Sequence, residues 1–221
     1  MTSLENQRIA EILKPLNRRA RHGRNVFARQ LRGVTGAVPR GKRSMNADKP
    51  WLKDAYVPTG QEQGCVLCRI VRARHARRIV EFDAAFGISA IHPAVATRDD
   101  RCGTPITTEI EPRKILRAGT NWPEAGLEGE CEPPAGDSLE TLRNTDGATD
   151  PLFPDGWNEA RLPVLRLLGS LLLRDACILC EYLEGVYKMR DLYMEYDLGK
   201  PDRSTSVELP PGEGLEVSVV V

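Results

Sequence analysis

Two Cys-x-x-Cys pairs, far apart in the chain, constrain the fold of this sequence more than any other feature. They are Cys65 with Cys68 and Cys177 with Cys180, and 108 residues lie between them. Two thiolates three positions apart can bind the same Zn²⁺, and a tetrahedral site takes two such pairs. A shared ion would staple two distant parts of the chain together. We therefore predict one zinc site with these four cysteines as ligands and His92 as the substitute ligand.

Other uses of the six cysteines stay open. Zinc ribbons and fingers usually have roughly 15–20 residues between their pairs, far fewer than here. Free cysteine is among the most buried residue types, so both pairs could instead be core thiols. A redox dithiol would sit between a strand and a helix of a βαβ unit, and neither pair shows that pattern. Cys102 and Cys131 stand alone in polar segments, as fourth ligands or as unpaired thiols.

The net charge of zero hides a division between the two halves of the chain. Residues 1–101 contain 20 Lys and Arg against 9 Asp and Glu, whereas residues 102–221 contain 11 against 22. Clustered basic side chains bind phosphates through counterion release, so the first half predicts a polyanionic partner. A solvated arm without a partner, or docking of one half on the other, is the alternative.

Nucleic acid is the partner that this charge pattern favours. Aromatic residues for base stacking are scarce in the basic half, which favours contacts with the RNA or DNA backbone, largely independent of base sequence. The predicted contact residues are Arg18, Arg19, Arg21, Arg24, Arg29, Arg32, Arg69, Arg72, Arg74, Arg77 and Arg78.

Apolar periodicity predicts a mainly α-helical protein with irregular loops and a few short strands. Helical patterns cover residues 3–31, the stretch after Cys65, and residues 163–196, where the signal is strongest. Short β-like segments are expected at 87–91 and 104–110. The predicted fold is a small zinc-stapled domain with a basic N-terminal arm.

The predicted organisation has five parts. They are a basic arm or helix at 1–50, a basic CxxC segment at 51–116, a Gly/Pro-rich acidic loop or linker at 117–160, a Leu-rich helical CxxC segment at 161–198 that packs on 51–116, and a polar tail at 199–221.

Motifs that carry catalytic chemistry are missing from the sequence. It contains no GxxxxGK[ST], HExxH or GxSxG motif and no GxGxxG that opens a helix, so we do not predict an enzyme. The favoured function is a zinc-stabilised, nucleic-acid-binding accessory or regulatory protein. The alternative is a zinc-stapled protein-interaction or assembly module that uses the Leu-, Tyr- and Met-rich residues 162–196, although these residues could also be the core of a small domain.

No apolar run approaches the roughly 20 residues that cross a bilayer, and the N-terminus lacks the apolar stretch of an export signal. We expect an intracellular protein without a membrane partner, nuclear if its source is a eukaryote or a virus and cytoplasmic otherwise. Residues 177–187 resemble the small nuclear non-structural proteins of some parvoviruses over this short stretch alone, and no family is assigned on it.

Overall fold

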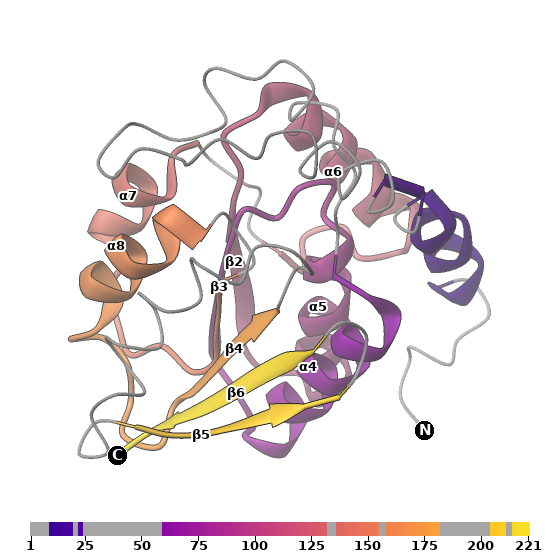
Figure 1. Ribbon diagram of the computed structural model, residues 1–221. Coiled ribbons are helices and arrows are strands. Elements are labelled where there is room, and N and C mark those ends of the chain that lie inside the picture. The colour runs from indigo at the N-terminus through magenta and orange to yellow at the C-terminus, as the bar shows by residue number, and fades with distance from the viewer. Residues whose placement is uncertain are drawn as a thin grey trace, which may run out of the picture.

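A six-stranded mixed β-sheet runs through the centre of the computed structural model (Figure 1). The structure describes residues 9–19, 22–23, 59–131, 136–154, 158–181, 204–210 and 214–221. The strands are β1 (Arg78–Phe82), β2 (Thr104–Thr108), β3 (Leu152–Pro154), β4 (Cys177–Glu181), β5 (Ser204–Leu209) and β6 (Leu215–Val220). They lie in the order β2-β1-β3-β4-β6-β5. The first four are mutually parallel, and β6 is antiparallel to both β4 and β5.

Helices cover both faces of the sheet. They are α4 (Gln61–Ala73), α5 (Ile88–Asp100), α6 (Pro112–Glu124), α7 (Ser138–Thr141), the short 3-10 helix η2 (Leu142–Asn144) and α8 (Asn158–Leu168). Figure 1 shows α4, α5 and α6 on one side of the sheet and α7 and α8 on the other. Because successive side chains of a strand point to opposite faces, Ile79 packs in the core under α4 and Val80 in the core under α8. The protein therefore has three layers, helix, sheet and helix.

The predicted mainly α-helical fold is wrong, and the strand β4 shows why. All five residues of β4 are buried, as are four of the five residues of β1. A parallel strand covered on both faces is apolar on both sides, so it shows no two-residue alternation. Without that alternation, the apolar run at 177–181 fits the helical pattern over 163–196, which predicts two helices there. Among the described residues of that region the α-helix is α8, which ends at Leu168, and residues 182–196 lie outside the described residues.

Other elements agree with the sequence in part. The helix expected after Cys65 is α4, and the β-like segment at 104–110 contains β2. The β-like segment at 87–91 instead forms the first turn of α5. The polar tail contributes strands β5 and β6 to the sheet.

A helix over residues 9–19 lies within the predicted helical span of 3–31. Its apolar side chains Ile9, Leu13 and Leu16 are buried against the core that α5 and α6 share, which includes Trp122. Its opposite face carries the basic residues, so the helix is amphipathic as predicted. Among the described residues, no helix is long and apolar enough to cross a membrane.

Helices α4 and α5 approach each other closely at Gly64 and His92. A Cβ atom added at Gly64 would lie 2.3 Å from Nε2 of His92, closer than real Cβ contacts. His92 is 1% exposed, so its ring has no free space into which to move. Burial also lowers the pKa of His92 to about 4, which keeps the imidazole neutral. Gly64 is therefore required by packing, although it stands inside a helix.

We expect Gly64→Ala to destabilise the protein, against the usual effect of this change in a helix. Replacing a helical glycine by alanine normally stabilises by about 0.5–1 kcal/mol, but overpacking here costs about 1–3 kcal/mol. Gly119→Ala is the matched control, because an added Cβ at Gly119 in α6 meets nothing within 4 Å. Urea unfolding should show a lower midpoint for Gly64→Ala and a higher one for Gly119→Ala. Equal midpoints for the two variants would contradict the packing argument.

Candidate functional site

The direction in which the sheet is built reverses at β1. From β1 the chain passes through α5 to β2 on one side, and it later returns to place β3 on the other side of β1. In open α/β sheets, ligands bind outside the carboxyl ends of the strands at such a switch point. The described residues that follow these strands are the turn at 83–87 after β1 and residues 109–111 after β2. They form the candidate site.

The turn after β1 has an unusual backbone. Asp83 and Ala85 have φ angles of 65° and 48°, in the left-handed region that glycine normally occupies, and Gly87 has a φ of 73°. The amide of Ala84 donates a hydrogen bond of 2.9 Å to the carbonyl of Thr108 in β2, which ties the turn to the end of the neighbouring strand. Left-handed residues other than glycine cost on the order of 1–3 kcal/mol each and cluster at functional sites. The strain marks this turn as a functional segment.

Two side chains of α6 hold the end of the turn. Asn121 Nδ2 donates to the carbonyl of Phe86 at 2.8 Å, and Trp122 Nε1 donates to the carbonyl of Gly87 at 2.9 Å. A Cβ at Gly87 would lie 2.6 Å from the same indole nitrogen, so glycine is required here for space as well as for its φ angle. The 13-residue helix α5 begins directly after this turn, and no side chain caps its N-terminus. Its first N–H groups therefore point out of the helix without an intrahelical acceptor.

Glu109 follows β2 at the same edge of the sheet. It is 2% exposed, and its Oε1 atom accepts a hydrogen bond of 2.8 Å from the amide of Glu111. The buried Oε2 atom accepts no hydrogen bond from any residue that the structure describes. Burial raises the pKa of Glu109 to about 8, the Asp83 carboxyl raises it further, and the positive charge of Lys114 opposes the rise. A buried acceptor without a donor is costly, so Oε2 indicates where a donor from a ligand would bind.

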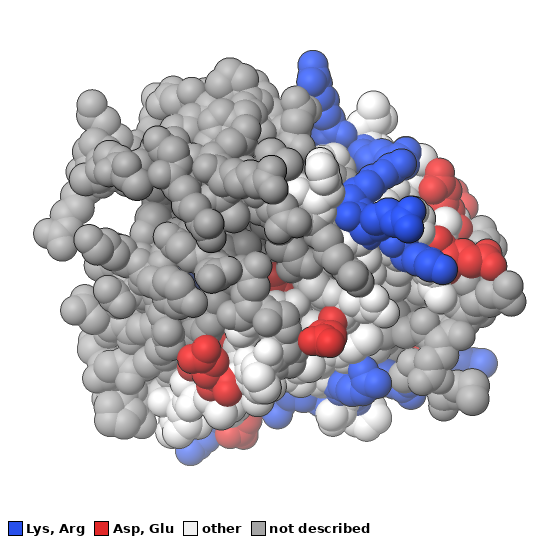
Figure 2. All heavy atoms as spheres, turned by 45° about the vertical axis from the view of Figure 1, so that its right-hand side comes forward, with Lys and Arg blue, Asp and Glu red and all other residues white. Residues whose placement is uncertain are grey.

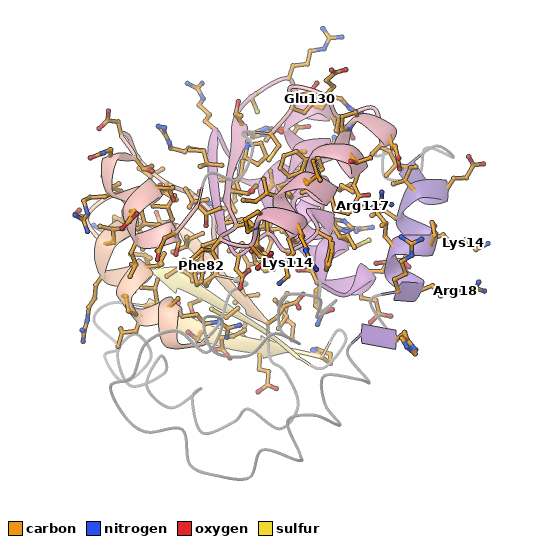
Figure 3. The ribbon with its side chains drawn as sticks, turned by 90° about the horizontal axis from the view of Figure 1, so that it is seen from above. Lys14, Arg18, Phe82, Lys114, Arg117 and Glu130 are labelled. Carbon is orange, nitrogen blue, oxygen red and sulfur yellow. The ribbon has the colours of Figure 1, made fainter. Side chains whose placement is uncertain are left out.

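Lys114 brings a buried cation to this region. It lies in the first turn of α6 and is 8% exposed, with its Nζ atom 6.0 Å from the centroid of the Phe86 ring. In Figure 3 Lys114 and Phe82 lie toward the middle of the molecule, whereas Lys14 and Arg18 project from its edge. The site thus combines two carboxyl groups, one ammonium group and an aromatic ring.

The predicted zinc ligands do not come together as a site. Cys177 packs in the core under α4, whereas Cys180, three residues along the same strand, packs in the core on the opposite face. Burial raises the pKa of Cys68 to about 12 and also raises that of Cys177, as expected for thiols packed in an apolar core. Over the parts of the chain that the structure covers, no three His, Cys, Asp or Glu side chains are grouped to hold a metal ion. The prediction of bound Zn²⁺ is therefore wrong.

Cys65, Cys131 and His92 lie in or against helices and strands of the fold. Cys65 lies half-buried on α4, one turn before Cys68. Cys131 Sγ donates to the carbonyl of Pro105 at 3.3 Å. His92 packs against Gly64, as described above.

The predicted phosphate-contacting arginines have different surroundings. Arg18 and Arg19 are exposed on the helix over residues 9–19, and Figure 2 shows basic side chains gathered on this side of the molecule. Arg72 instead pairs with Asp100 at 3.1 Å and Asp99 at 3.7 Å. Arg74 donates to the buried Asp150, Arg69 donates to the carbonyl of Cys65, Arg77 is exposed and Arg78 is half-buried in β1. Arg21, Arg24, Arg29 and Arg32 lie outside the described residues. Nothing in these positions tests binding of nucleic acid, which stays a prediction.

Comparison with known proteins adds information at the level of structure. No protein-family model and no curated protein sequence matches the chain. Among solved structures, the SAH-bound methyltransferase PaMTH1 of Podospora anserina is 19% identical, with 89% of this chain and 94% of that chain covered at a TM-score of 0.66. A putative O-methyltransferase from Klebsiella pneumoniae is 18% identical, with 93% and 90% covered at a TM-score of 0.63. The SAM-bound O-methyltransferase TomG of Streptomyces achromogenes is 21% identical, with 81% and 91% covered at a TM-score of 0.63. The chain therefore has the fold of class I SAM-dependent O-methyltransferases.

This finding corrects the predicted function. The solved structures named above are methyltransferases or a putative methyltransferase, and two of them hold SAH or SAM. The prediction of a zinc-stabilised nucleic-acid-binding accessory protein is therefore wrong, and so is its zinc-stapled interaction alternative. The prediction that the chain is not an enzyme is wrong for the same reason. Nothing in these likenesses supports a viral accessory role.

The glycine signature of this site is incomplete, so the sequence alone does not reveal the site. In dinucleotide-binding turns glycines occupy the tight positions, but here Asp83 and Ala85 adopt left-handed angles and only Gly87 is a glycine. A search for GxGxxG therefore finds nothing. The usable signal was an apolar strand, a turn ending in Gly87, and an acidic residue 22 positions later at Glu109. That spacing is close to the roughly 20 residues that separate glycine turn and ribose-binding acid in such folds.

The raised pKa of Glu109 predicts a dependence of stability on pH. Between pH 4.5 and about 8 the folded carboxyl keeps its proton, whereas the unfolded one has lost it. The unfolded state then binds fewer protons, so this group makes stability fall as pH rises, by up to about 1.4 kcal/mol per pH unit. Glu109→Gln removes this contribution. The stability of the variant relative to wild type should therefore increase from pH 5 to 8 and level off above pH 8.

Chemical denaturation at a series of pH values measures this difference. Glu128→Gln is the control, because Glu128 is exposed in the segment after α6 and its stability difference from wild type should stay flat. A flat difference for Glu109→Gln would show that Glu109 ionises in the folded protein as it does in the unfolded chain.

Proposed function

We propose that this protein is a SAM-dependent methyltransferase that transfers a methyl group to an oxygen nucleophile of its substrate. The fold is shared with methyltransferases, and structures among them contain SAM or its product SAH. The observation that carries the proposal is the buried, donor-less Oε2 atom of Glu109 beside the strained turn after β1. Fold alone does not establish an activity, so the proposal depends on whether these residues fit the cofactor.

The nucleoside end of SAM fits the acceptor at Glu109. Its ribose carries two neighbouring hydroxyl groups, which are hydrogen-bond donors, and Glu109 Oε2 is a buried acceptor with no donor among the described residues. An acidic residue about 20 positions after the glycine turn bonds ribose hydroxyls in related α/β folds. Glu109 would bind and orient the ribose, with its Oε1 atom held in place by the amide of Glu111.

The amino-acid end of SAM fits the start of α5. That end carries a carboxylate, and the uncapped N–H groups of a 13-residue helix provide donors and a partial positive charge. The hydrogen bonds from Asn121 and Trp122 to the turn keep these groups in position. Bound SAM supplies an activated methyl group on a sulfonium centre. The task of the chain is therefore to hold the cofactor and the acceptor in line, which is catalysis by proximity and orientation.

Direct binding of SAM and SAH tests the proposal. Isothermal titration calorimetry on the purified full chain should show binding of both molecules. At pH 9, where the Glu109 carboxyl is ionised, Glu109→Gln should weaken both by about 10–100-fold, because a hydrogen bond to a charged group contributes about 1.5–3 kcal/mol. Glu128→Gln should bind as wild type does. If the wild-type chain binds neither molecule at millimolar concentration, the proposed function is wrong.

A further inference from the structure

Lys114 occupies an unusual position for a lysine. Long charged side chains are almost never fully buried unless they are paired, yet Lys114 is 8% exposed and lies over the ring of Phe86. It stands five residues after Glu109, in the first turn of α6. A cation over an aromatic face is attracted to the ring. That attraction alone is small compared with the free-energy cost of burying an ammonium group. A nearby negative charge explains the position better.

The charges around Glu109 are unbalanced without Lys114. The charged groups that the structure places against Glu109 are Asp83, from the turn after β1, and Lys114, from α6. Asp83 stands at the first position of the turn and brings a second carboxyl group close to Glu109. The buried Glu109 carboxyl, beside the half-buried Asp83 carboxyl, ionises more readily when a nearby cation compensates its negative charge. Lys114 is that cation, and it is buried beside the Phe86 ring.

We infer that Lys114 is a positioning residue that stabilises the ionised Glu109 carboxylate against Asp83 and thereby sets the affinity for the nucleoside end of the cofactor. This inference rests on the proposed function for its cofactor part. Ribose hydroxyls donate hydrogen bonds, and an ionised carboxylate accepts them more strongly than a neutral carboxyl group does. Lys114 acts through Glu109 and has no assigned contact of its own with the reacting atoms.

The inference predicts opposite effects for two neutralising substitutions. Lys114→Met keeps the length of the side chain and removes its positive charge, so the apparent pKa of Glu109 should rise by about one pH unit. Asp83→Asn removes the repelling negative charge, so the same pKa should fall. Lys114→Arg keeps the charge and should restore behaviour close to wild type. A role for Lys114 in packing alone would not produce shifts of opposite sign.

Carbon-13 NMR of glutamate carboxyl groups in the unliganded full chain measures this titration, with the Glu109 signal assigned by its loss in Glu109→Gln. Arg117→Met is the matched control, because Arg117 lies on α6 three residues further on and toward the helix over residues 9–19 in Figure 3. Its Glu109 titration should equal that of wild type. An unchanged titration in Lys114→Met, or a fall in that variant, would overturn the inference.

Calorimetry with SAH tests the cofactor part. At pH 7 Lys114→Met should bind SAH about tenfold more weakly, and raising the pH should recover the affinity as Glu109 ionises. Lys114→Arg and Arg117→Met should bind as wild type does. A Lys114→Met variant that shifts the Glu109 titration but binds SAH normally would overturn the link to cofactor affinity. Absence of SAH binding by the wild-type chain would instead overturn the proposed function, and the NMR titration would still decide whether Lys114 stabilises the Glu109 carboxylate.

Discussion

Burial of the parallel strands on both faces is the constraint on which the rest of the structure depends. Strands β1 and β4 have almost no exposed side chains, so each needs a helical layer above it and another below it. Parallel strands also need a crossover from the end of one to the beginning of the next. Each crossover starts at the carboxyl edge of the sheet. The turn after β1 and the acidic residue after β2 therefore meet at one edge, and the site is a consequence of how the core is covered.

The core also supports a strained turn that would not persist alone. Asp83 and Ala85 hold left-handed conformations at a cost on the order of 1–3 kcal/mol each. The hydrogen bonds from Asn121 and Trp122 in α6, and the packing of Trp122 against the helix over residues 9–19, hold the end of that turn. Packing of the core thus stabilises the turn that forms part of the candidate site. The same arrangement explains why Gly87 cannot be enlarged, since the indole of Trp122 fills the space beside it.

Charged side chains of this protein also pair with residues that are distant in the sequence. The arginines interleaved over 69–78 suggested a phosphate-binding surface, but Arg72 pairs with an aspartate 28 residues away and Arg74 with one 76 residues away. Docking of one half of the chain on the other was an alternative explanation of the charge division. The pair of Arg74 with Asp150 joins the two halves in this way, because Asp150 belongs to the acidic half. Composition alone could not tell which arginines are paired within the protein and which face solvent. That distinction depends on the packing of α4 against α5 and on the position of the segment before β3.

Local patterns along the chain determined the amphipathic helix over 9–19, the helix after Cys65 and the strand after Thr104, because their periodicities depend only on neighbouring residues. Tertiary structure alone decided the rest. Residues 177–181 form a strand because both of their faces are covered, and that coverage separates Cys177 from Cys180 on opposite sides of the sheet. The turn 83–87 forms without the expected glycines because α6 and β2 hold its backbone. Asp83 comes together with Glu109 and Lys114, which stand five residues apart in the sequence, only because parallel strands end at a common edge, a relation between distant segments that no local pattern records.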